Sequence, residues 1–193
     1  MMRTLKYLLA VLLIVSCAIG CKSEASKTEG STSNSWKPEF KTKLSEYGHR
    51  NWILIVDKAF PAQNSAGIVT IDTHQGLLKV LDYTLAQIDS STHVKPNIFT
   101  DKELGYITKE QVENIDGYRT ALLKSIEKYQ PKSMLHDSVF VNIDKASKLF
   151  QVLVLKTDEV IPYSSIFIQL DCKYWTEEKE HSLRKRMDSP VNR

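Results

Sequence analysis

The sequence predicts a single α/β domain with helices on both faces of one mostly parallel or mixed sheet, in a three-layer α/β/α arrangement. Short runs rich in β-branched residues alternate along the chain with segments whose apolar residues recur at helical spacing. The chain has 193 residues, of which 42% are hydrophobic and 25% are charged. A chain of this length and composition can bury one full core and not comfortably two.

The N-terminus has the pattern of an export signal. A basic stretch precedes an apolar run over residues 7–15, which is shorter than the about 20 residues that a membrane-spanning helix needs. Small residues then precede Cys21, and this order resembles the lipobox of a bacterial lipoprotein. Cys17 is a second choice for the lipidation site, and a plain secretory signal or a short buried helix is the alternative. We expect residues 1–20 to be a signal peptide and Cys21 to carry the lipid. This predicts a protein anchored in the bacterial cell envelope, facing the periplasm or the exterior.

The rest of the chain divides by composition. Residues 21–35 carry no large apolar side chain and are typical of a flexible tether. The domain is expected over residues 36–176, and residues 177–193 form a charged tail, either a solvated helix or a frayed end. Only Cys172 would remain free, so no intramolecular disulfide is expected. Without the basic residues of the signal the net charge falls from +3 to about +1, which argues against a nucleic-acid partner.

The first half of the domain is predicted from apolar spacing. A helical pattern ends at Gly48. Residues 52–56 form a continuous apolar run that ends at Asp57, which is typical of a strand covered on both faces. Residues 68–71 predict a short second strand, and a stripe over residues 77–88 predicts the next helix. The apolar positions of the two helices are Phe40, Leu44 and Tyr47, and Leu77, Leu78, Leu81, Leu85 and Ile88.

The second half continues the alternation. Residues 108–111, Thr-Lys-Glu-Gln, resemble a capping box and predict the start of a helix. His136 is expected in a loop before a further helix. Residues 149–155 and 166–170 predict two late strands. The inward positions of the helix after the capping box are Val112, Ile115, Leu122 and Ile126.

No Walker loop, Rossmann glycine pattern, serine nucleophile elbow or Cys/His zinc spacing occurs in the sequence. Their absence removes most cofactor and nucleotide chemistries. What remains is a sparse set of polar residues beside the expected strand ends: His49, Asp57, His136 and the segment Pro162-Tyr163-Ser164-Ser165. Ligands of open α/β sheets bind at the carboxyl ends of strands. Taken alone, each of these residues is more often a cap or a turn former.

Their spacing resembles a known family. Gly48-His49, the apolar run, Asp57 and Phe60-Pro61 closely resemble the opening motif of the ribose pyranase/fucose mutarotase (RbsD/FucU-like) family. Further motifs follow in the family's order: a second strand, the helix after it, a second histidine before its helix, a Pro-Tyr turn and a last strand. These motifs are residues 69–72, residues 76–81, His136 before Phe140, residues 156–163 and residues 166–168. The resemblance spans about residues 38–171, and motifs that are weak singly are specific in this order.

The resemblance implies an RbsD-like fold and a mutarotase or pyranase that interconverts monosaccharide ring forms or anomers without a cofactor or a metal. It implies His49 as the principal acid/base, with Asp57 orienting that imidazole or binding a sugar hydroxyl. His136 and Tyr163 would add proton-transfer or hydroxyl contacts, and Ser165 would position the sugar. It also implies a ring-shaped homo-oligomer, often a decamer, with each site at a subunit boundary and Tyr163 supplied by a neighbouring chain.

The chain departs from the family pattern at a few points. Ser165 stands where the family usually has asparagine, and the family's lysine near the start of the helix after His136 has no clear counterpart. An export signal also precedes a domain that is typically cytoplasmic. Two other hypotheses therefore accompany the first. One is a non-catalytic, sugar-binding lipoprotein of the same fold, and the other is a hydrolase with His49, Asp57 and His136 as metal ligands.

Overall fold

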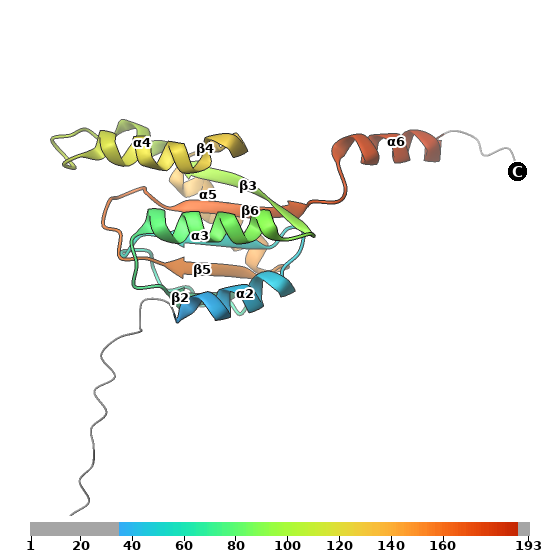
Figure 1. The fold of residues 1–193 in the computed structure, drawn as a ribbon, viewed down its shortest axis with the longest axis horizontal. Helices are drawn as coiled ribbons and strands as arrows, with labels where there is room; N and C mark the ends of the chain where they lie inside the picture. The colour runs from blue at the N-terminus through green and yellow to red at the C-terminus, as the bar shows by residue number, and fades with distance from the viewer. Residues whose placement is uncertain (1–34, 189–193) are drawn as a thin grey trace, which may run out of the picture. The chain divides into compact units, whose positions relative to one another are not determined.

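The structure is a computed structural model that describes residues 35–188. One six-stranded sheet runs through it in the order β2-β5-β1-β6-β3-β4 (Figure 1). The predicted signal peptide, the lipidation site Cys21, the predicted tether up to residue 34 and residues 189–193 lie outside the described residues. Within the described part of the chain, no helix has both the length and the apolar character to cross a membrane.

The sheet is mixed. Strand β6 runs antiparallel to both of its neighbours, β1 and β3, whereas the β1–β5, β2–β5 and β3–β4 pairs are parallel. The strands are β1 (Trp52–Val56), β2 (Ile68–Asp72), β3 (Val94–Asp101), β4 (Lys132–Met134), β5 (Val152–Lys156) and β6 (Ile166–Cys172).

Helices cover both faces of the sheet, which confirms the predicted three-layer arrangement. Side chains of a strand alternate between its faces, so Ile53 and Ile55 of β1 join one buried cluster while Leu54 and Val56 join another. The first cluster lies under α2, α3 and α4, and the second lies under α5. Figure 1 shows α3 in front of the sheet and α5 behind it. The helices are α2 (Trp36–Glu46), α3 (Leu77–Ser90), α4 (Ile115–Ile126), α5 (His136–Ser147) and α6 (Glu177–Asp188), with short 3-10 turns at Lys102–Tyr106 and Glu127–Tyr129.

The helix predicted from the capping box begins later than expected. One hydrogen bond of the box forms, in which the side chain of Gln111 accepts from the backbone N–H of Thr108 at 2.9 Å. The turn does not propagate, since Asn114 adopts a left-handed conformation with φ 57° and α4 begins at Ile115. A residue in that conformation cannot continue a right-handed helix.

Two further expectations need correction. His136 is the first residue of α5 and does not lie in the loop before it. The late strand begins at Val152, and Leu149 is exposed. Strands β3 and β4 were not predicted. The segment from residue 177 takes the helical form of the two alternatives, as α6, in which no residue is buried.

The register of the sheet decides which loop residues meet. Ile55 of β1 and Thr100 of β3 are both paired with Ile166 of β6. One end of the sheet therefore brings together the residues that follow β1 and β3 and the residues that precede β6. At the other end, Trp52 of β1 pairs with Gln169 of β6.

Candidate active site

A cavity of about 290 Å³ opens at the carboxyl end of β1, beside the first turn of α5. Three predicted site residues line it: Asp57, His136 and Tyr163. The rest of its wall is apolar or aromatic. The complete lining is Asp57, Ala59, Phe60, Pro61, His136, Phe140, Pro162 and Tyr163.

Asp57 is held in place by local hydrogen bonds. The backbone N–H of Ala59 donates to its Oδ1 at 2.8 Å, and the hydroxyl of Ser165 donates to its Oδ2 at 3.0 Å. The Ser165 hydroxyl also accepts a hydrogen bond from the backbone N–H of Asp57 at 3.3 Å. Ser165 is 1% exposed and is not among the residues that line the cavity. The structure thus places Ser165 behind the carboxylate, where it fixes the direction of Asp57.

His136 is held from two sides. Its backbone N–H donates to the carboxylate of Glu103 at 3.1 and 3.2 Å, and its Nδ1 lies 2.9 Å from Oδ2 of Asp101. In front, the ring meets Phe140 and Tyr163 edge-on, with centroids 4.9 and 5.2 Å apart. The imidazole therefore lies between a carboxylate and two aromatic rings at the N-terminus of α5.

Asp101 is a site residue that the sequence reasoning missed. It is the last residue of β3 and is 2% exposed, and its Oδ1 has no hydrogen-bond partner within residues 35–188. Burial raises the pKa of this carboxyl to about 6, against the opposing pull of the His136 imidazole. A signal existed, because Asp101 is the last residue of its strand and Asp57 directly follows β1. Pro96 and the weak apolar pattern hid that strand.

Tyr163 comes from the same chain as the rest of the cavity wall. The turn before β6 folds back onto the start of α5 and brings the Tyr163 ring to His136 of the same chain. That a neighbouring chain supplies Tyr163 to a site at a subunit boundary stays a prediction. Its backbone has φ 59°, the left-handed region that bulky residues rarely adopt. Such conformations cost about 1–3 kcal/mol and persist only where the surroundings determine them.

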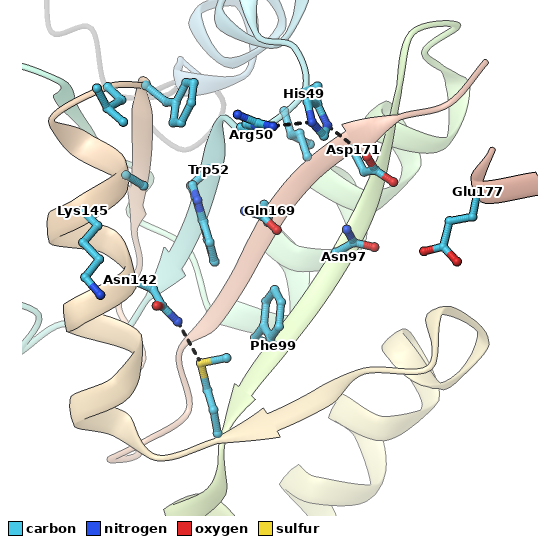
Figure 2. Close-up of a pocket in the computed structure, with 15 residues that line it drawn as sticks. His49, Arg50, Trp52, Asn97, Phe99, Asn142, Lys145, Gln169, Asp171 and Glu177 are labelled. Carbon is cyan, nitrogen blue, oxygen red and sulfur yellow. Dashed lines mark hydrogen bonds and ion pairs between the residues drawn. The ribbon is translucent and has the colours of Figure 1, made fainter. Parts of the chain in front are cut away.

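His49 lies at the opposite end of the sheet. It precedes β1, whereas Asp57 follows it, and its Nδ1 pairs with Oδ1 of Asp171 at 3.0 Å while Arg50 donates to its Nε2 at 3.1 Å. Figure 2 shows this group at the rim of a different hollow, of about 640 Å³. The prediction that Asp57 orients His49 is therefore wrong within one chain, and His49, Asp57 and His136 do not assemble into one metal site.

That second hollow lies on an open part of the sheet. Trp52, Gln169 and Asn97 are opposite one another on β1, β6 and β3, and Figure 2 shows them side by side on one face. Phe99 stacks on Trp52 with ring centroids 5.7 Å apart. Lys145 lies along the edge formed by α5. The surface is mixed in charge and wide, in contrast to the small cavity at Asp57.

One group of side chains among the described residues has the spacing of a metal site. Asp72, His74 and Asp158 bring their ligand atoms within 4.8 Å of one another, and all three are exposed. Lys58 already supplies a cation there, with its Nζ 2.7 Å from Asp158 and 3.7 Å from Asp72. Lys58 thus compensates the two carboxylates, and none of the four residues lines the cavity at Asp57.

The cavity combines the groups that a small polyhydroxylated ligand needs. Asp57 accepts hydrogen bonds, Tyr163 can donate and accept, and His136 offers a ring nitrogen that can do either. Phe60 and Phe140 stack with centroids 5.5 Å apart and supply an apolar wall for C–H groups. This arrangement can hold a small hydroxylated molecule and move a proton on and off it.

The chain was compared with protein families, curated proteins and solved structures. The sequence profile described as the RbsD / FucU transport protein family matches residues 32–172. Among solved structures, the chain is similar to Bacillus subtilis RbsD complexed with D-ribose, with 17% identity over 68% of this chain and 89% of that chain and a TM-score of 0.46. It is also similar to FucU from Bifidobacterium longum, with 21% identity, 68% and 92% coverage and a TM-score of 0.44. The fucose mutarotase from Streptococcus pneumoniae in complex with L-fucose is similar too. Its identity is 18% over 68% of this chain and 90% of that chain, and the TM-score is 0.47. No curated protein matches the chain.

Proposed function

This chain belongs to the RbsD / FucU transport protein family, and from that premise we propose that it is a monosaccharide mutarotase or pyranase. One of the similar solved structures is a fucose mutarotase, and mutarotases are isomerases. The observation that carries the proposal is that His136, Asp57 and Tyr163 surround one cavity of about 290 Å³. Small-molecule pockets begin at about 300 Å³, so a single sugar ring is the class of ligand that suits this volume.

The reaction makes a simple demand on its site. Opening the ring of a sugar breaks the bond between the anomeric carbon and the ring oxygen. The anomeric hydroxyl loses a proton while the ring oxygen gains one, and closure reverses both transfers. The site must therefore offer an acid and a base at once. The uncatalysed reaction already proceeds in water, so an acceleration of about 10²–10⁴-fold, within reach of positioned acid–base groups, suffices.

The proposed roles follow the geometry of the cavity. His136 takes the proton of the anomeric hydroxyl, since a neutral imidazole accepts a proton through the ring nitrogen that carries the lone pair. Tyr163 faces His136 and donates to the ring oxygen through its hydroxyl. Asp57, whose direction is fixed by Ser165 and Ala59, accepts a hydrogen bond from another sugar hydroxyl.

The test is ring-form exchange by NMR. Saturation transfer between anomeric protons is measured for ribose, fucose, galactose and rhamnose with the soluble domain. Exchange that rises in proportion to protein concentration supports the proposal. Sugar binding without faster exchange favours the second candidate, a non-catalytic sugar-binding protein. The observation behind that candidate is Ser165, which is buried and bonded to Asp57 where the family usually has an asparagine.

We further propose a homo-oligomer in which His49 serves the cavity of a neighbouring subunit. Tyr163 and the cavity wall come from one chain, whereas His49 is at the far end of β1, with its side chain 53% exposed. A second copy is the way for this imidazole to approach a sugar in the Asp57 cavity. The open sheet face beside His49 supports the idea that another chain packs there.

The location in the cell envelope is also a proposal. The apolar run over residues 7–15 and the small residues before Cys21 support it. A lipid on Cys21 would anchor the domain to the membrane surface without a spanning helix. The sugar would then be a free monosaccharide outside the cytoplasm.

A further inference from the structure

Asp101 is buried in a way that stability alone does not explain. Its side chain is fully enclosed, one oxygen faces Nδ1 of His136 at 2.9 Å, and the other has no hydrogen-bond partner among the described residues. A buried carboxylate with an unsatisfied oxygen costs free energy. We therefore look for the role of Asp101 in its contact with His136 and not in stability.

The contact with His136 has a definite chemical consequence. An ionised carboxylate can only accept hydrogen bonds, so Nδ1 of His136 must carry the hydrogen. In the neutral ring the other nitrogen, Nε2, then has the lone pair. Nothing within residues 35–188 forms a hydrogen bond with Nε2, and the ring lines the cavity. Nε2 is thus the nitrogen available to a ligand.

A second carboxylate, that of Glu103, holds the backbone of His136. Glu103, in the 3-10 turn that follows Asp101, accepts the backbone N–H of His136 through both oxygens. Because Asp101 ends β3 and Glu103 follows it closely, one short segment holds both the backbone and the ring of His136. The first residue of α5 has little freedom to rotate.

We propose that Asp101 is a positioning residue, which holds His136 as the Nδ1–H tautomer and so presents Nε2 as the proton acceptor in the cavity. The inference rests on the proposed function, because it assigns the proton-accepting atom of that reaction. Asp101 itself is not expected to touch the sugar, since it does not line the cavity.

The tautomer can be read directly in the whole protein. Long-range ¹⁵N–¹H spectra of ¹⁵N-histidine protein distinguish Nδ1–H from Nε2–H, and His136→Gln identifies the signals of this ring among the five histidines of the chain. At pH 7.5 the wild-type ring is expected as Nδ1–H. In Asp101→Asn the amide can donate to Nδ1 instead, so a mixture or the Nε2–H form is expected.

Kinetics of the same variant separate positioning from scaffolding. Asp101→Asn is expected to lower kcat for ring-form exchange by about 10–100-fold, with KM changed less than about twofold, because the sugar contacts remain while the proton acceptor is lost. The matched control is Asp89→Asn, an exposed carboxylate that accepts hydrogen bonds from Lys128 and Tyr129 at 2.8 Å. This control should leave both constants and the His136 tautomer unchanged.

The outcomes are distinguishable. A wild-type ring in the Nε2–H form, or an Asp101→Asn variant that keeps both the Nδ1–H tautomer and the rate, overturns the positioning role. An Nδ1–H ring in a protein that exchanges no sugar supports the positioning and contradicts the proposed function. Should Asp101→Asn fail to fold, the wild-type tautomer still decides, because the proposal requires Nδ1–H there.

Discussion

The ring of Tyr163 meets the ring of His136 edge-on, with centroids 5.2 Å apart and planes at 89°. One residue starts α5 and the other lies in the turn before β6, so the contact depends on the sheet register that brings both to the same end. The pair forms one wall of the cavity beside Asp57. This contact brings together, in one chain, two of the predicted site residues.

Tyr163→Phe tests the hydroxyl of this pair. The phenylalanine ring keeps the edge-on contact with His136, whereas the donor to the sugar ring oxygen is lost. Exchange is expected to fall about 10–100-fold with the melting temperature nearly unchanged. Tyr106→Phe, at a residue that is 73% exposed and away from the cavity, is the control. Equal rates for both variants would remove Tyr163 from the proton transfer.

Asp101→Asn should change stability in the opposite direction from activity. The pKa of Asp101 is raised from 3.8 to about 6. Between these values only the folded state holds the proton, so stability falls as pH rises and the loss is complete above about pH 6. Asparagine avoids this loss. A shift of about two units corresponds to about 3 kcal/mol, so the variant should gain up to that amount over wild type between pH 4 and pH 8.

The measurement is urea unfolding of both proteins at several pH values. The difference between the two curves reports the pH-dependent contribution of the Asp101 carboxyl to stability. A constant difference from pH 4 to pH 8 would show that Asp101 has the same pKa in both states.

Mixing two inactive variants tests whether His49 acts across subunits. His49→Ala and His136→Asn are each expected to lose most of their exchange activity. When the two are unfolded together and refolded as mixed oligomers, about a quarter of the sites regain both histidines from different chains. Recovery of about that fraction supports the shared site, and no recovery above the separate variants would contradict it.

Cys21→Ser tests the membrane anchor. The wild-type protein expressed in bacteria should carry a mass increase of acyl chains on Cys21 and fractionate with membranes. The serine variant should lack that mass and leave the membrane fraction, because serine has no thiol to acylate. Cys172→Ser is the control, and acylation that persists in Cys21→Ser would direct attention to Cys17.

Local pattern was sufficient for part of the fold. Strand β1 and helix α3 were predicted because their apolar residues follow one another at strand or helix spacing. Strand β3 was not, since Pro96 interrupts it and only three of its eight residues are buried. Its place depends on pairing with β6, which local spacing does not reveal. Asp101 was missed with it.

The site was predicted in part for the same reason. Motif order predicts Asp57, His136 and Tyr163 as site residues, and the sheet register brings them together. His49 and Asp57 flank a five-residue strand, and at about 3.3 Å per residue such a strand is about 17 Å long. One chain cannot bring both side chains to one sugar. The length of the apolar run over residues 52–56 therefore already indicates that His49 and Asp57 lie at opposite ends of a strand.

The proposed function requires His136 to move a proton on a sugar in the Asp57 cavity. The most direct measurement is saturation transfer between anomeric protons with wild type and His136→Asn, at equal concentration and with His181→Asn in the exposed helix α6 as control. We expect faster ring-form exchange with wild type and with the control, and a loss of about 10²-fold or more in His136→Asn. Undiminished exchange in folded His136→Asn would contradict it.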